Sequence, residues 1–375
     1  MPIPTVRKIQ DNRTVLQQLG LLAEFAGTWQ GTGFNLVGRP DFEDHTNVFL
    51  EFNLTSETTQ FSPISSSIPN RGFEQADIEL FGLTYLQQIS DATTGGALHI
   101  EPGIWVTVPA TTEPPLSPPA GGQLVARMAN IPHGNSLLAQ GVATTFNGPP
   151  VIDPGANPVS GGNPSFSLFP SFNSTPIDLA PALAAGVPLG APVFAPGTSE
   201  AQSKPGGGFS EYTLTNPPNP TNTRTPLGNV PPVLPPSITQ ALVNDPLVLL
   251  QQTIQDQIAQ GYSFSGVALN IATVTSITFF NAPVINGKPL PGTTPVNLAQ
   301  AGGGIENLAF LVPNAQSVLV YATFWLEKLT HPSQRPSMQL QYAQMTMLNF
   351  PALIPGQPNF SWPHIQVGTL QKTFG

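Results

Sequence analysis

The stretch Val48-Phe49-Leu50-Glu51-Phe52-Asn53-Leu54 places an apolar side chain at every second position. Side chains of a β-strand point alternately to its two faces, so this pattern predicts a strand with one face in a core. Similar runs, closed by turn residues, follow at intervals of roughly 8–12 residues, which is typical of antiparallel barrels and sandwiches. The further predicted strands are 76–83, 84–89, 97–100, 104–108, 123–129, 136–145, 266–280, 318–326, 338–347 and 364–372.

The composition supports an all-β fold. The 375 residues include 35 glycines and 44 prolines, only 9% are charged, and 40% are hydrophobic. Prolines this dense would break helices throughout, whereas the apolar content is sufficient for a sizeable core. We therefore predict an antiparallel closed β-barrel of about eight to ten strands, with a long irregular insertion and one or two short helices.

The chain is expected to fold as one barrel interrupted in its middle. The insertion is rich in Pro-Pro and Gly-Gly pairs but also carries several phenylalanines, so we expect ordered irregular structure, with a mobile linker as the alternative. Its final helix has Ser237 as a candidate N-cap and Pro246 as a break, and its apolar stripe should pack on the barrel. The predicted parts are a helical lead-in (1–20), the first part of the barrel (21–146), the insertion (147–261) ending in a helix (238–260), and the second part of the barrel (262–375).

Charge and residue usage exclude several kinds of function. The net charge is −9, and no basic run exceeds the pair Arg7-Lys8, which argues against nucleic-acid binding. The lack of cysteine excludes thiolate catalysis, zinc–cysteine and iron–sulfur sites, and covalent haem attachment. No apolar stretch predicts a secretion signal or a membrane span, so a cytoplasmic protein without membrane contact is expected. The oligomeric state is left open.

Four segments far apart in the chain carry recognisable motifs. They are Gly27-Thr28-Trp29-Gln30-Gly31-Thr32-Gly33, Leu98-His99-Ile100-Glu101-Pro102-Gly103, Leu138-Ala139-Gln140, and Pro363-His364-Ile365 followed by Thr369-Leu370-Gln371-Lys372. In the same order they resemble the elements Gly-Thr-Trp-x-Gly-x-Gly, Leu/Met-His-x-Glu-x-Gly, Leu-Ala-Gln and Pro-His-Leu-x-Ala-Thr-Leu-x-Lys of the nitrobindins, a family of haem-binding β-barrels. The resemblance covers about 22–146 and 265–374 of the chain.

The resemblance implies haem b in the mouth of the barrel. His364 would be the axial iron ligand, and His99 would lie on the opposite side of the haem as the catalytic acid–base group. It also implies reaction with peroxynitrite or binding of nitric oxide, which we extend to peroxide, because a distal imidazole can move a proton across a bound oxidant. Strand alternation should point His364 into the barrel together with Gln366.

Other candidate site residues come from their positions alone. His133 lies on a predicted turn that could overhang the mouth, Met345 is a possible iron ligand on a predicted strand, and Trp29 either contacts the ligand or packs in the barrel floor. The remaining histidines, His45 in an acidic loop and His331 at a predicted hairpin turn, are expected to be solvated.

Two functions remain open from the sequence. The first is a haem-dependent peroxynitrite isomerase, peroxidase-like enzyme or gas-binding protein. The second is a non-catalytic, lipocalin-like carrier of a small apolar molecule. His99 and Glu101 lie two residues apart on one strand face, so they could share a pocket or form a purely structural hydrogen bond.

Overall fold

The computed structural model describes most of the chain outside the insertion. The predicted end of a strand at 274–280, most of the insertion and His45 lie outside the described residues. The described ranges are 11–41, 46–113, 115–118, 120–150, 152, 237–239, 242, 246–273, 303–350 and 360–373, together with four short pieces at 175–176, 194–195, 223–224 and 284–289 (without 286–287).

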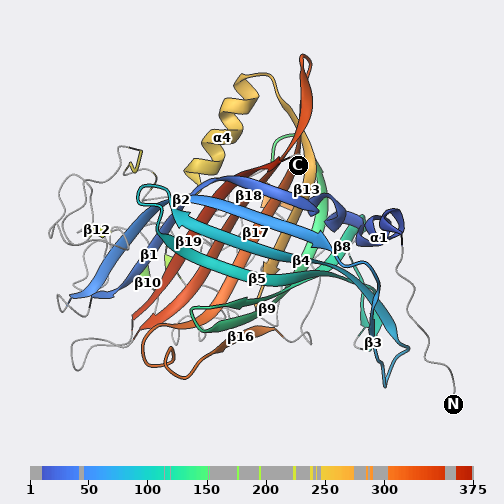
Figure 1. Ribbon diagram of the computed structural model, residues 1–375, viewed down its shortest axis with the longest axis horizontal. Coiled ribbons are helices and arrows are strands. Elements are labelled where there is room, and N and C mark those ends of the chain that lie inside the picture. The colour runs from blue at the N-terminus through green and yellow to red at the C-terminus, as the bar shows by residue number, and fades with distance from the viewer. Residues whose placement is uncertain are drawn as a thin grey trace.

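Ten antiparallel strands form one closed barrel, which confirms the predicted fold class (Figure 1). The pairing of β4 with β2 closes the ring. In order around the barrel the strands are β2 (Thr46–Pro63), β1 (Gly27–Asp41), β19 (Phe360–Thr373), β18 (Gln334–Phe350), β17 (Gln316–His331), β13 (Ser263–Ala272), β9 (Asn135–Asn147), β8 (Gly122–Ile131), β5 (Ala97–Val108) and β4 (Ile78–Asp91).

Short strands extend or flank this ring. β16 (Gly304–Asn307) pairs with β9, β3 (Ile68–Asn70) pairs with β4, and β12 (Thr223–Arg224) runs parallel to β2. Three further pairs of two-residue strands stand apart from the barrel sheet. They are β6 (Thr111–Thr112) with β7 (Pro115–Leu116), β10 (Thr175–Pro176) with β11 (Phe194–Ala195), and β14 (Val284–Ile285) with β15 (Lys288–Pro289).

Strands from both sides of the insertion belong to one sheet, with β19, β18, β17 and β13 as one block between β1 and β9. The first strand pairs with the last, from Thr28 opposite Thr373 to Val37 opposite His364, without a shift in register. β9 pairs with β13, the first strand after the insertion. The barrel is therefore closed by segments far apart in the sequence.

In two places, two strands predicted separately from the sequence form a single long strand in the structure. The predicted runs 76–83 and 84–89 belong to β4, and 97–100 and 104–108 belong to β5. Pro102 does not break β5, because it lies opposite Leu86 of β4 just before the pairing with β8 begins at Gly103. A proline without an N–H is tolerated where one side of a strand lacks a partner.

A short helical segment closes one end of the barrel (Figure 1). Helix α1 (Asn12–Leu19) begins at its N-cap Asp11 and ends at Gly20, whose positive φ of 54° favours glycine. It continues into the 3₁₀ turn η1 (Gly20–Phe25), which the sequence did not predict, and Leu22 and Phe25 are buried there. Trp29 is buried beside them, and its indole N–H donates to the Phe25 carbonyl at 2.7 Å. These buried side chains form an apolar floor at this end of the barrel.

The helix before β13 packs on the outer face of the barrel, as its apolar stripe predicted. Helix α4 (Val248–Ala259) begins just after Pro246, where the sequence predicted a break. Before it, residues 240–241 and 243–245 lie outside the described part, and the N–H of Leu242, itself helical, donates to the Thr239 hydroxyl at 3.2 Å. Leu250 and Ile254 of α4 are buried against outward-facing apolar side chains of the barrel strands. No helix among the described residues is long and apolar enough to cross a membrane.

A polar group is buried beneath α4. Glu327 is 0% exposed and accepts a hydrogen bond from the Gln339 amide at 2.6 Å, while its other oxygen and the Gln341 carbonyl oxygen have no hydrogen-bond partner. Burial raises the pKa of Glu327 to about 8, against the lowering effect of the Gln339 bond. Glu327 is therefore neutral over most of the physiological pH range.

We expect Leu250→Ala to lower the free energy of unfolding by about 2–5 kcal/mol, because it removes a fully buried side chain between α4 and the barrel. Ile258→Ala on the same helix is the control, since Ile258 is 40% exposed, and it should change stability by no more than about 0.5 kcal/mol. Urea unfolding of both variants gives the comparison. Equal effects would mean that α4 is not docked as described.

Glu327→Gln should flatten the dependence of stability on pH. Between pH 4.5 and about 8 the folded protein keeps the Glu327 proton that the unfolded chain releases, so stability falls as pH rises through this window. The contribution approaches about 1.4 kcal/mol per pH unit at most. Urea unfolding from pH 5 to 9 checks this, and an identical slope in wild type and variant would contradict it.

Candidate functional site

The inner face of the barrel carries polar side chains at regular spacing. On β2, Asn53, Thr55, Glu57 and Thr59 all point inward and are nearly inaccessible to solvent. The opposite face of the same strand carries Phe52, which packs toward α4. The interior therefore is not an apolar core along its whole length.

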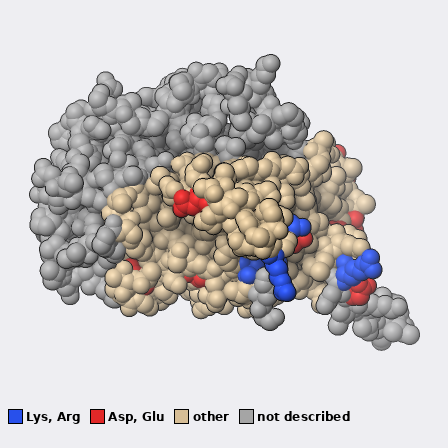
Figure 2. Space-filling model, turned by 90° about the horizontal axis from the view of Figure 1, so that it is seen from above, with Lys and Arg blue, Asp and Glu red and all other residues tan. Residues whose placement is uncertain are grey.

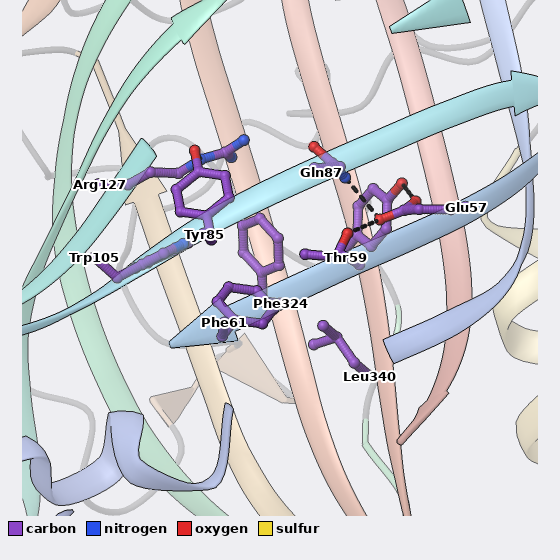
Figure 3. Close-up of a pocket in the computed structure, with 10 residues that line it drawn as sticks. Glu57, Thr59, Phe61, Tyr85, Gln87, Trp105, Arg127, Phe324 and Leu340 are labelled. Carbon is purple, nitrogen blue, oxygen red and sulfur yellow. Dashed lines mark hydrogen bonds between the residues drawn. The ribbon is translucent and has the colours of Figure 1, made fainter. Parts of the chain in front are cut away.

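Glu57 lies at the centre of one interior network. It accepts hydrogen bonds from the Tyr342 hydroxyl, from the Thr59 hydroxyl at 2.7 Å and from the Gln87 amide at 2.8 Å (Figure 3). The Gln366 amide in turn donates to the Tyr342 hydroxyl at 2.8 Å. Burial raises the pKa of Glu57 despite these hydrogen bonds, and burial and Glu57 together raise the pKa of Tyr342 well above its usual range.

A buried ion pair forms a second network beside the first. The Arg127 guanidinium contacts the Glu101 carboxylate, and it donates to the Tyr85 hydroxyl at 2.9 Å and to the Gln344 amide oxygen at 2.7 Å. Burial alone would raise the pKa of Glu101, but the charge of Arg127 and hydrogen bonds from His99 and Tyr85 outweigh it and lower the pKa to about 2. Glu101 is therefore ionised. Charged side chains are otherwise sparse in this protein, and few are seen among the described residues on the face shown in Figure 2.

Two glycines make room for the tyrosine rings of these networks. Tyr85 lies opposite Gly103, and Tyr342 lies opposite Gly368. A Cβ atom at either glycine would collide with the ring of the facing tyrosine. Glycine at these strand positions therefore lets each ring lie across its neighbouring strand.

Side chains fill the middle of the barrel. Between the two networks and the apolar floor lies a cavity of only about 10 Å³, bounded on the floor side by Phe61, Phe324 and Leu340 (Figure 3). Such a volume is at the lower limit for a single water molecule. A larger ligand has no room in this layer.

Three of the five histidines lie together at the end of the barrel away from α1. The rings of His99 and His133 lie 5.6 Å apart, and the His99 Nε2 lies 3.3 Å from the Glu101 carboxylate. His364 opposes Val37 at the same end and is near enough that charge on His99 or His133 acts on it. Burial, with a smaller effect of those two imidazoles, lowers the pKa of His364 to about 3.

The structure brings together His99, His133 and His364 but not the other two candidates. His364 points inward on the same face of β19 as Gln366, as alternation predicted, and it hydrogen-bonds to Asn35. Met345 lies on the outer face of β18, in the cluster beneath α4, and does not reach the interior. The interpretation of Met345 as an iron ligand is therefore wrong, because one strand position separates the two faces.

Trp29 lies at the floor of the barrel, far from the histidines. On the paired strand it opposes Lys372, eight positions from His364, or roughly 26 Å at the usual rise of a strand. Its indole is buried and hydrogen-bonded to Phe25. Of its two sequence interpretations, floor packing describes what the structure shows.

Three polar residues of the barrel interior were not predicted from the sequence. Arg127, Glu57 and Asn35 lie on three different strands, and only the register of the sheet places them near the predicted site. One signal was available, since polar residues at positions 53, 55, 57 and 59 repeat with the period of a strand face. The repeat shows only that one face of this strand is polar; the closed barrel shows that this face is the interior.

Comparison with known proteins reveals distant similarity. No family model and no curated protein matches the sequence. Among solved structures, the chain is similar to the crystal structure of Rv2717c from M. tuberculosis, with 10% identity over 96% of this chain and 98% of that one, and a TM-score of 0.32. The strand pairings of this chain establish its ten-stranded barrel independently of this similarity.

We expect Glu101→Gln to lower the free energy of unfolding by about 3–5 kcal/mol, because it leaves the Arg127 charge buried without a counter-ion. Adding Arg127→Met should recover much of this loss. Asp77→Asn, which breaks the exposed Arg71–Asp77 pair, is the control and should have little effect. Similar losses for Glu101→Gln and Asp77→Asn in urea unfolding would contradict the account of the interior.

Proposed function

We propose that the protein binds haem b at the histidine-bearing end of the barrel, with His364 as the iron ligand, and that it acts on small oxidants or gases. The observation that supports this best is the position of His364. It points into a closed barrel, its imidazole is neutral at physiological pH, and two further imidazoles lie beside it.

The donor set suits haem better than a bare metal ion. Among the described residues, no three histidine, cysteine, aspartate or glutamate side chains are arranged to hold a metal ion. The macrocycle supplies most ligands of a haem iron, so a single neutral imidazole suffices as the protein ligand. The cavity in the middle layer measures about 10 Å³ and is too small for haem, so the proposal places the group at the histidine-bearing end.

The haem iron would supply the binding and redox chemistry for peroxynitrite, nitric oxide or peroxide. The chain would supply proton transfer. Ionised Glu101 can only accept hydrogen bonds, so the His99 Nε2–H faces it and the Nδ1 lone pair is left to take up a proton. His99 is thus oriented for general acid–base catalysis.

The alternative is a carrier of a small apolar molecule. The layer below the histidines holds an ion pair and a second buried carboxyl group, so an apolar ligand would there meet groups that favour polar partners. This arrangement favours the haem proposal. Haem titration distinguishes the two, because a carrier of apolar molecules has no need of His364.

We expect the purified protein to take up one equivalent of hemin, with a Soret band shifted from that of free hemin. His364→Ala should weaken this binding at least about tenfold, whereas His99→Ala should retain the haem and alter its reaction with peroxide or peroxynitrite. His331→Ala is the control, because His331 lies at the opposite end of the barrel and bonds to the Gln260 carbonyl. Equal hemin binding by wild type and His364→Ala would overturn the assignment of the ligand.

A further inference from the structure

A chain of hydrogen bonds runs from His364 across the inner faces of three neighbouring strands. The His364 Nε2 bonds to the Asn35 side-chain oxygen. The Asn35 amide donates to the Asn53 oxygen at 3.1 Å, and the Asn53 amide donates to the Asp91 carboxylate at 3.1 Å. These residues lie on β19, β1, β2 and β4, which are adjacent in the barrel, and we call them the Asp91 chain.

The direction of every bond in the Asp91 chain follows from its last member. The Asp91 carboxylate accepts from the backbone N–H groups of Thr93 and Thr94 on one oxygen and from the Asn53 amide on the other, so the Asn53 NH₂ group faces Asp91. The Asn53 oxygen then accepts from the Asn35 NH₂ group, which leaves the Asn35 oxygen facing His364. Because that oxygen can only accept, the proton of the neutral imidazole must be on Nε2, and the lone pair is on Nδ1.

Asp91 also fixes the turn that leads to β5. Its second oxygen accepts from the backbone N–H groups of Thr93 and Thr94 at 2.9 and 2.7 Å, and from the Thr94 hydroxyl at 3.0 Å. β5 starts at Ala97, two residues before His99. One carboxylate, 1% exposed, therefore holds both the chain to His364 and the turn before His99.

We infer that Asn35, Asn53 and Asp91 are positioning residues that fix the orientation and tautomer of His364, so that Nδ1 presents its lone pair to a ligand. The fixed tautomer is a property of the protein alone. Only the identity of the ligand, haem iron, rests on the proposed function. A ligand imidazole needs its other nitrogen held, and loss of such a partner typically weakens metal binding about 10–100-fold.

The test without haem is NMR of the full-length protein labelled with ¹⁵N-histidine. Wild type should show one His364 tautomer, protonated on Nε2, whose N–H proton exchanges slowly with water. Asn35→Leu should increase the exchange rate at least about tenfold, because the acceptor is gone. Asn130→Leu, which removes an amide on the exposed side of β8, is the control and should leave the His364 signal unchanged.

Asp91→Asn tests whether the far end of the Asp91 chain matters as well as the His364–Asn35 hydrogen bond. It keeps the size of the side chain. Without an acceptor-only end, the amides of Asn53 and Asn35 can turn over, so His364 should show two tautomers or a faster exchange. This variant also provides the test if Asn35→Leu does not fold. A His364 N–H that is unprotected in wild type, or that responds to neither variant, would overturn the inference.

Hemin titration of the same proteins separates this inference from the proposed function. Asn35→Leu should weaken hemin binding about 10–100-fold relative to wild type and to Asn130→Leu. If wild type binds no hemin but its His364 N–H is protected, the haem proposal fails and the Asp91 chain stands. If hemin binds at His364 and the N–H is unprotected, the Asp91 chain fails and the haem proposal stands.

Discussion

Closure of the sheet is the constraint on which the rest of this structure depends. β1 pairs with β19 and β2 pairs with β4, so each of the ten barrel strands has two neighbours and every second side chain enters one narrow interior. Polar side chains far apart in the sequence must then supply one another's hydrogen-bond partners. Arg127 meets Gln344 across 217 positions, and Glu57 meets Tyr342 across 285. A slip of one residue in any strand would turn these groups to the wrong face.

The interior is divided into three layers along the barrel axis. Trp29 and Phe25 pack at the floor, the ion pair and the Glu57 network fill the middle, and the imidazoles lie at the far end. A buried ion pair adds little net stability compared with apolar side chains, because desolvation offsets its attraction. We interpret the middle layer instead as a polar support, since Glu101 contacts His99 directly and keeps an ionised acceptor beside it.

The sequence predicted the class of fold better than the site. Alternation and turn spacing predicted most strands and the barrel, because a strand face is recorded in every second residue. The inward direction of His364 followed from the same rule, whereas Met345 failed because nothing local showed which face of β18 was inside. Asn35 and Asp91 could not be linked to His364 from the sequence. Asn35 is 329 residues from His364, and only the register of β1 against β19 brings the two side chains together.

A crystal structure of the protein grown with hemin tests the central claim most directly, because it shows at once which atom holds the iron. The account predicts iron bound to an imidazole nitrogen of His364, with His99 and His133 at the same end of the barrel and the Arg127–Glu101 layer unchanged beneath. Hemin bound to another residue or on the outer surface, or an interior without hemin when it is present in excess, would contradict it.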